Sequence, residues 1–413
     1  MSEPSPEARP TIIAIFNGTP QWNTPETVGL SGGDRILFES LRHWTRLEGG
    51  PRIELLTDPS GFEMLKLYDG DLATRLTVRL TRVKRSDYRF LAWLFPKKTR
   101  AACRAISRMQ VEPGTIFFSA SDLFPDSLPG LYARRRHPQA RWCGALYFFS
   151  APPWSKEAPY RGLVARARGF LYWASQRYCY RQLRRHADTV VTCNDADREV
   201  FIQDGYPAHR LWSIYGGVDL SVCDAVPEPP QKTYDAVFMA RFHPQKGPLE
   251  AVKAWAQFVR RRPEARLAMI GNGPEEGAVR AFIAANGLEK NIHLMGYMDG
   301  EAKYRVLKAS RLFLHPAVYE TGGMAAAEGM AAGLPVVAFD HRGFDYCYPK
   351  GLVRIAPVGD TQRFALAIER LLTDGAEYAR VRGEALELSR TWDWSSRSAL
   401  LLEHILKAGR EAR

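Results

Sequence analysis

Two glutamates, Glu320 and Glu328, stand eight positions apart in the chain. Gly322 and Gly323 lie between them, at the start of a run of small residues that predicts a helix. A glycine pair at a helix start exposes backbone N–H groups and the positive end of the helix dipole, which suits a diphosphate. Glu320 would lie in the loop beside the bound anion, and Glu328 would accept hydrogen bonds from sugar hydroxyls. An alanine-rich core helix with two solvated glutamates is the alternative.

Two cations, Arg241 and Lys246, follow a predicted strand at 235–239. Open α/β sheets bind ligands at the carboxyl ends of their strands. Fixed cations there would stabilise the charge that develops on a leaving diphosphate more strongly in the transition state than in the ground state. A surface loop with two solvated cations is the alternative. Gly271 and Gly273 follow the next strand and form either part of a nucleotide site or a plain turn.

Two series of strands that alternate with helical patterns must position these residues, and such alternation predicts doubly wound parallel sheets. The predicted strands are 11–16, 52–57, 115–118, 142–148 and 189–192, then 235–239, 266–270, 292–295, 312–315 and 335–339. A proline-rich stretch at 226–230 predicts a linker between two domains. With 413 residues, the chain is long enough for two domains.

The Glu-x7-Glu pattern, with Arg241 and the Lys246-Gly247 pair, resembles the family 4 (group 1) glycosyltransferases, which are retaining enzymes. The resemblance implies an α/β GT-B fold, in which two Rossmann-like domains face a cleft. We expect a disordered tail at 1–10, an acceptor-side domain at 11–215 and a nucleotide-sugar domain at 216–394. The segment 395–413 would be a C-terminal helix that crosses back to the first domain.

The resemblance also implies roles for individual residues. Glu320, Arg241 and Lys246 would be catalytic, with Glu320 on the donor-sugar hydroxyls and Glu328 on the ribose. The full set of expected donor contacts is Gly32, Gly33, Arg241, Lys246, Gly271, Gly273, Gly322, Gly323, Met324 and Glu328. No metal or cofactor is expected besides a UDP- or GDP-type nucleotide sugar, and the leaving phosphate would itself deprotonate the acceptor.

The acceptor side departs from the family pattern. Phe148 and Phe149 stand where many members carry histidine, before a Pro-Pro pair. Another group would then supply the polar contact to the sugar, or the acceptor is presented differently. Phe149 and Asp122 are the candidate acceptor contacts, and Asp122 is alternatively a helix N-cap.

The net charge of +12 is concentrated in two stretches of the first half. Residues 79–108 hold ten Lys or Arg and one acid, and residues 161–185 hold seven Arg, no acid and interleaved aromatic residues. This composition predicts peripheral docking on an anionic membrane and a glycan or lipid-linked acceptor. A helix with a solvated arginine face and an aromatic core face is the alternative. The first residues lack the apolar core of a signal peptide, so a cytoplasmic protein is expected.

The leading prediction is therefore a metal-independent retaining glycosyltransferase acting in cell-envelope polysaccharide or glycolipid assembly. Three alternatives remain: a catalytically silent GT-B partner subunit, another GT-B sugar-nucleotide enzyme, and a nucleic-acid-binding protein suggested by the charge. No recognisable nucleic-acid module accompanies the charge.

Overall fold

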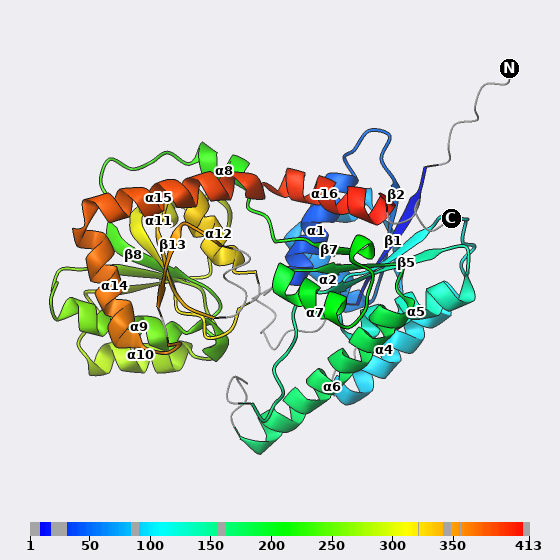
Figure 1. The fold of residues 1–413 in the computed structure, drawn as a ribbon, viewed down its shortest axis with the longest axis horizontal. Coiled ribbons are helices and arrows are strands. Elements are labelled where there is room, and N and C mark those ends of the chain that lie inside the picture. The colour runs from blue at the N-terminus through cyan, green and yellow to red at the C-terminus, as the bar shows by residue number, and fades with distance from the viewer. Residues whose placement is uncertain are drawn as a thin grey trace. The chain divides into compact units, whose positions relative to one another are not determined.

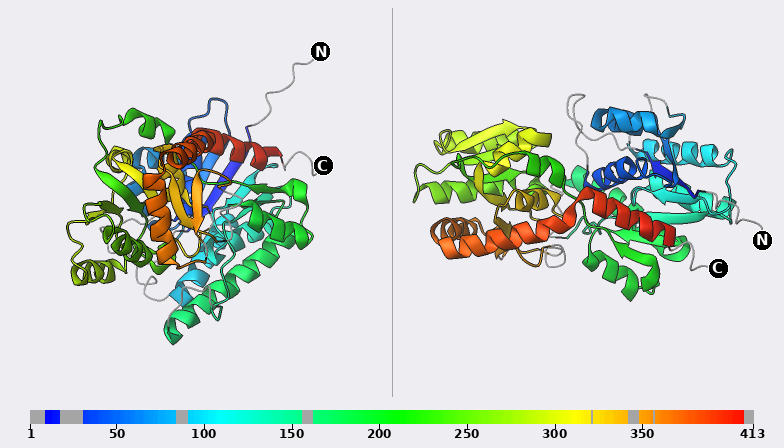
Figure 2. Two further views of the ribbon diagram at one scale, coloured as in Figure 1. Left: turned by 60° about the vertical axis from the view of Figure 1, so that its left-hand side comes forward. Right: turned by 90° about the horizontal axis from the view of Figure 1, so that it is seen from above.

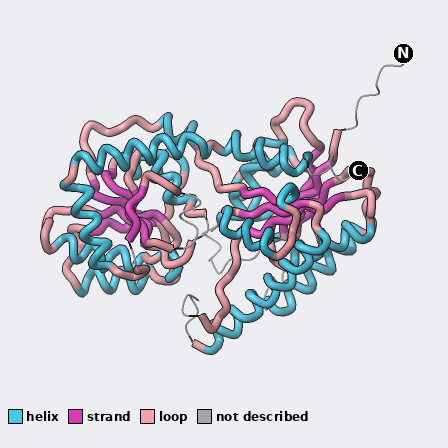
Figure 3. The backbone as a smooth tube through the Cα atoms, viewed as in Figure 1, coloured by secondary structure: helices cyan, strands magenta, loops and turns pink. Residues whose placement is uncertain are grey.

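The computed structural model describes residues 9–17, 31–83, 91–155, 162–320, 322–341, 348–355 and 357–407. The chain divides into two compact units, Met1–Ile214 with Ser395–Arg413, and Tyr215–Trp394. Each unit holds one sheet enclosed by helices (Figures 1 and 3). Most of the tail expected at 1–10 lies outside the described residues.

The first unit is built on seven parallel strands in the order β3-β2-β1-β4-β5-β6-β7. Their bounds are β1 Thr11–Phe16, β2 Arg52–Thr57, β3 Thr77–Leu80, β4 Ile116–Ser119, β5 Arg141–Leu146, β6 Thr189–Thr192 and β7 Leu211–Ser213. The central strands are buried on both faces, which explains their continuous apolar runs. The strand order reverses between β1 and β4.

Helices connect these strands and cover the sheet (Figure 2). They are α1 Gly32–Trp44, α2 Pro59–Tyr68, α3 Gly70–Arg75, α4 Leu91–Ile106, α5 Phe124–Arg136, α6 Leu163–His186 and α7 Asp195–Gln203. The C-terminal helix α16, Trp394–Lys407, returns to this unit. It packs against α1, where the Trp44 indole Nε1 donates a hydrogen bond to the Ser398 carbonyl at 2.8 Å. The expected crossing of the last helix back to the first domain is confirmed.

The second unit has six parallel strands in the order β10-β9-β8-β11-β12-β13. They are β8 Tyr234–Met239, β9 Leu267–Ile270, β10 Ile292–Gly296, β11 Ser310–His315, β12 Val336–Phe339 and β13 Leu352–Ile355. One face packs on α9 Pro248–Val259, α10 Glu276–Ala285 and α14 Thr361–Thr373. The other face packs on α8 Leu220–Ala225, α11 Gly300–Lys308, α12 Met324–Ala331 and α15 Gly375–Ser389. The predicted doubly wound α/β architecture is thus confirmed in both units.

The differences from the predicted elements are confined to sheet edges and strand ends. β3, β7 and β13 were not predicted, and each is a strand of only three or four residues that ends its sheet. The predicted strand at 142–148 ends instead at Leu146, so Tyr147 and Phe148 belong to the following loop. This change moves both aromatic residues to the carboxyl edge of the first sheet.

Candidate active site

The order of strands in the second unit reverses between β8 and β11, which are hydrogen-bonded neighbours. Crevices at such a switch point, outside the carboxyl ends of the strands, are the usual ligand sites of open α/β sheets. The loop after β8 carries Arg241 and Lys246, and the loop after β11 carries Glu320. The fold therefore brings the three expected catalytic residues to one edge of one sheet.

Arg241 lies in a loop that is fastened to the loop after β9. The Phe242 amide donates to the Asn272 carbonyl at 2.7 Å, and the Glu275 amide donates to the Phe242 carbonyl at 2.9 Å. Gly271 has a φ of +132°, and a Cβ there would stand 2.0 Å from the Ala240 carbonyl oxygen. Glycine at 271 therefore permits the close approach of the two loops.

Lys246 and Glu320 form an ion pair across the two loops. Their backbones are joined as well, because the Val318 amide donates to the Gln245 carbonyl at 3.0 Å. The side chains expose 26% and 12% of their surface, so the pair is partly shielded from water. Glu320 is thus the counter-charge of Lys246.

The surroundings of Arg241 are electropositive. Arg241 has no carboxylate partner among the described residues, and its partial removal from water lowers the pKa of the guanidinium. Burial, together with the charges of Arg241 and Lys246, lowers the pKa of His243 to about 4. His243 is therefore neutral at pH 7, and the fixed positive charge beside it suits an anionic ligand.

His315, the last residue of β11, completes this edge of the sheet and had no predicted role. It is 3% exposed, and its Nε2 lies 3.7 Å from Glu320 Oε2. Burial lowers the pKa of His315 to about 3, although the Glu320 charge acts in the opposite direction. The imidazole is neutral at pH 7, so the Glu320 carboxylate has a neutral and a cationic neighbour.

The glycine pair begins α12, as its position between the glutamates predicts. Gly323 is the N-cap in the left-handed region, with a φ of +49°. The Tyr348 hydroxyl donates to the Gly322 carbonyl, and the Tyr348 ring lies where a Cβ on Gly323 would stand. Met324, the first helical residue, packs on Gly216. Tyr348 was not identified from the sequence, because it lies 26 positions from Gly322.

Glu328 is 4% exposed in α12 and is ion-paired with Lys303 of α11 at 2.9 Å. Glu320 is also mostly shielded, so neither glutamate is a solvated surface residue. The Glu328 carboxylate therefore belongs to a buried ion pair between α11 and α12.

In the first unit the candidate acceptor residue Asp122 follows β4 at the switch point of that sheet. It does not cap α5, whose N-cap is Leu123 without a side-chain hydrogen bond. Its carboxylate instead accepts a 2.6 Å hydrogen bond from the buried Gln176 Nε2. Burial raises the pKa of Asp122 to about 6, and that of the neighbouring Asp126 to about 7.

Gln176 also fixes the loop in which histidine was expected. Its Nε2 donates to the Phe148 carbonyl at 2.7 Å, and its Oε1 accepts from the Ser150 amide at 2.8 Å. The Phe149 ring does not share this polar environment, because it packs against Tyr180 and Phe201. The Gln176–Asp122 pair therefore contacts the loop in which histidine was expected.

Gly32 and Gly33 begin α1, where Ser31 and Asp34 form a capping box. The Tyr147 ring packs on Gly33, so closely that a Cβ there would stand 2.6 Å from Tyr147 Cδ2. The preceding residues 18–30 lie outside the described part of the chain. The glycine at 33 thus has a packing reason besides the expected donor contact.

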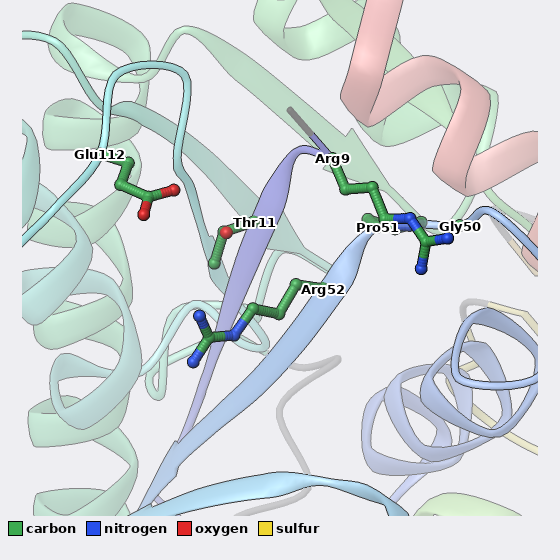
Figure 4. Close-up of a pocket in the computed structure, with 6 residues that line it drawn as sticks. All are labelled: Arg9, Thr11, Gly50, Pro51, Arg52 and Glu112. Carbon is green, nitrogen blue, oxygen red and sulfur yellow. The ribbon is translucent and has the colours of Figure 1, made fainter. Parts of the chain in front are cut away.

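A surface hollow in the first unit lies away from these residues (Figure 4). It is found at the amino ends of β1 and β2 and is lined by Arg9, Thr11, Gly50, Pro51, Arg52 and Glu112. Parallel sheets bind their ligands at the opposite, carboxyl edge. The hollow is therefore not assigned to the candidate site.

The match to a known protein family lies within the second unit. The family model of glycosyl transferases group 1 matches residues 224–387. A D-inositol 3-phosphate glycosyltransferase of Corynebacterium glutamicum is 26% identical over 55% of this chain and 59% of its own length. A phosphatidyl-myo-inositol mannosyltransferase of Mycobacterium leprae is 28% identical over 44% of this chain and 50% of its own. The chain thus spans about half the length of these curated relatives.

A solved structure extends the likeness to nearly the whole chain. The crystal structure of Anabaena HepE in complex with UDP and glucose superposes with a TM-score of 0.69 over 95% of this chain and 98% of that one. At 16% identity this likeness establishes the fold and not the activity.

Proposed function

We propose that this chain, which belongs to the group 1 glycosyl transferases and has the GT-B fold, transfers a sugar from a nucleotide sugar to an acceptor hydroxyl with retention. The observation that carries the proposal is the meeting of Arg241, Lys246 and Glu320 at the switch point of the second sheet. We further propose a glycan or lipid-linked acceptor in polysaccharide or glycolipid assembly. The catalytically silent subunit is the alternative.

In the proposed reaction Arg241 and Lys246 bind the diphosphate and stabilise the charge that it gains as the sugar leaves. The backbone N–H groups at the start of α12, beside Gly322, Gly323 and Met324, add a helix dipole to the same anion. Gly271 and Gly273 hold the neighbouring loop near the nucleotide. Glu320 holds the donor-sugar hydroxyls, and Glu328 holds the ribose. Gly32, Gly33 and Asp122 are proposed as further contacts to the donor and the acceptor.

A nucleotide-binding experiment tests this proposal first. The melting temperature is measured with excess UDP, GDP, ADP and dTDP in turn. A nucleotide at about 100 times its Kd should stabilise the protein by about 2.7 kcal/mol. We expect a shift with UDP or GDP, in keeping with the UDP held by HepE. If none of the four raises the melting temperature, the silent-subunit alternative replaces the enzyme.

We also propose that α6 docks on an anionic membrane at the cytoplasmic face. Leu163, Val164 and Leu171 of this helix are 86%, 69% and 60% exposed, and they alternate with the exposed Arg166 and Arg168. No acidic residue occurs between 162 and 186. The aromatic residues do not all face the core, because Phe170 is 47% exposed. None of the described helices is long and apolar enough to span a bilayer.

Co-sedimentation with vesicles containing phosphatidylglycerol tests this docking. Each basic residue near an anionic surface contributes about 1 kcal/mol, so Arg166→Ala/Arg168→Ala should weaken binding roughly 30-fold. Leu163→Ser/Leu171→Ser should weaken it as well. Leu366→Ser is the matched control, because Leu366 is 50% exposed on α14 of the other unit. Equal sedimentation of all four proteins would exclude α6 as the docking surface.

A further inference from the structure

A buried ammonium group lies beside the proposed ribose-binding carboxylate. Lys303 is 2% exposed on α11, a helix that covers the same face of the second sheet as α12 (Figure 1). Its Nζ donates to Glu328 Oε1 at 2.9 Å and to Asp299 Oδ1 at 2.8 Å. Asp299 is the N-cap of α11, so the ammonium group is tied to the start of its own helix.

The packing of α11 and α12 on the sheet does not by itself require the Lys303–Glu328 ion pair. The core on this face of the sheet is apolar and includes Tyr304 and Leu307 of α11 and Ala327 and Met330 of α12. Buried ion pairs are often replaced by apolar residues of similar volume without loss of stability, because desolvation of both charges offsets their attraction. A role for the ion pair in placing Glu328 explains what stability alone does not.

We propose that Lys303 is a positioning residue, which binds Glu328 and holds its carboxylate in the orientation that accepts the ribose hydroxyls of the donor nucleotide. This inference rests on the proposed function. Glu328 lies within the first two turns of α12, whose N-terminus is the proposed diphosphate site. A carboxylate fixed there has the reach to contact a ribose attached to that diphosphate. Without Lys303 the carboxylate would lose this charged hydrogen-bond donor.

The test compares UDP with 2′,3′-dideoxy-UDP, which lacks both ribose hydroxyls. The ratio of their Kd values, measured by calorimetry on the full chain, reports the contact between protein and ribose. Hydrogen bonds to a charged group are strong, so the wild type should prefer UDP by about tenfold or more. Lys303→Met should reduce this ratio to about twofold. Glu328→Gln should reduce it as much, and the double variant should reduce it no further.

Two further variants make the experiment decisive. Lys308→Met is the matched control, because Lys308 lies on the same helix and donates to the Val226 carbonyl. It should leave the ratio unchanged. Lys303→Gln retains a hydrogen-bond donor without the charge and should fold if Lys303→Met does not. In Lys303→Gln the ratio of the two Kd values should be at least threefold lower than in the wild type. A merely structural role for Lys303 would weaken both nucleotides equally and leave the ratio at its wild-type value, which would overturn the proposal.

The outcomes also separate this inference from the proposed function. GDP and 2′,3′-dideoxy-GDP are measured in parallel with the uridine pair. If the wild type binds neither UDP nor GDP, the nucleotide site itself is refuted. Binding of UDP and its dideoxy form with equal affinity would refute the ribose contact of Glu328, and with it the role of Lys303. A preference for UDP that persists in a folded Lys303 variant would refute the role of Lys303 alone.

Discussion

Glu320→Gln is expected to lower kcat by about 10²- to 10³-fold, the range seen when one group that stabilises a transition state is removed. The substitution preserves the size of the side chain and removes its charge. Positive charge develops on the sugar as its bond to the diphosphate breaks, and a carboxylate beside it stabilises that charge in the transition state more than in the ground state. The measurement is steady-state transfer from a sugar donor that carries the nucleotide identified by thermal stability.

The same substitution should strengthen the binding of the product nucleotide. Glu320 is ion-paired with Lys246, and its neutralisation releases the ammonium group for the diphosphate. A partly exposed pair contributes about 1 kcal/mol, so the Kd for UDP should fall about fivefold. Glu369→Gln removes a carboxylate paired with Arg261, which lies in the turn after α9, and is the matched control. A kcat of Glu320→Gln within threefold of the wild type would exclude the proposed role.

The central strands and the order of elements could be predicted from the sequence, because strands buried on both faces are continuous apolar runs between turn residues. β12 illustrates this: Val337 and Phe339 belong to one apolar core, and Val336 and Ala338 to the other. The edge strand β3 could not be predicted in the same way, since its four residues are largely exposed and leave no apolar pattern.

The candidate site was predictable where its residues are close in sequence. Glu320, Gly323 and Glu328 belong to one loop and helix, and their spacing indicated the geometry. Their supporting residues come from distant segments. Lys303 precedes Glu328 by 25 positions on another helix, and Gln176 follows Asp122 by 54. Such contacts depend on the packing of helices on the sheet, which no local pattern encodes.

Arg241→Met is expected to lower kcat/KM by about 10²- to 10³-fold and to weaken UDP binding about tenfold. In contrast to Lys246, Arg241 is paired with no carboxylate within the described ranges, so its charge is available to the diphosphate without breaking an ion pair. The loop that carries it is fixed by hydrogen bonds of Phe242 and Glu275, so little order must be gained on binding. Transfer kinetics and calorimetry with UDP measure the two effects.

Arg241→Lys separates the contribution of charge from that of shape. Lysine restores the positive charge but not the planar fork that binds two phosphate oxygens, so we expect kcat/KM between that of the wild type and that of Arg241→Met. Arg266→Met is the control, because Arg266 is exposed immediately before β9, at the amino edge of the same sheet. Equal losses in Arg241→Met and Arg266→Met would indicate a general effect of charge. A loss confined to Arg241→Met would support an anion site at the carboxyl edge of the sheet, where Arg241 lies.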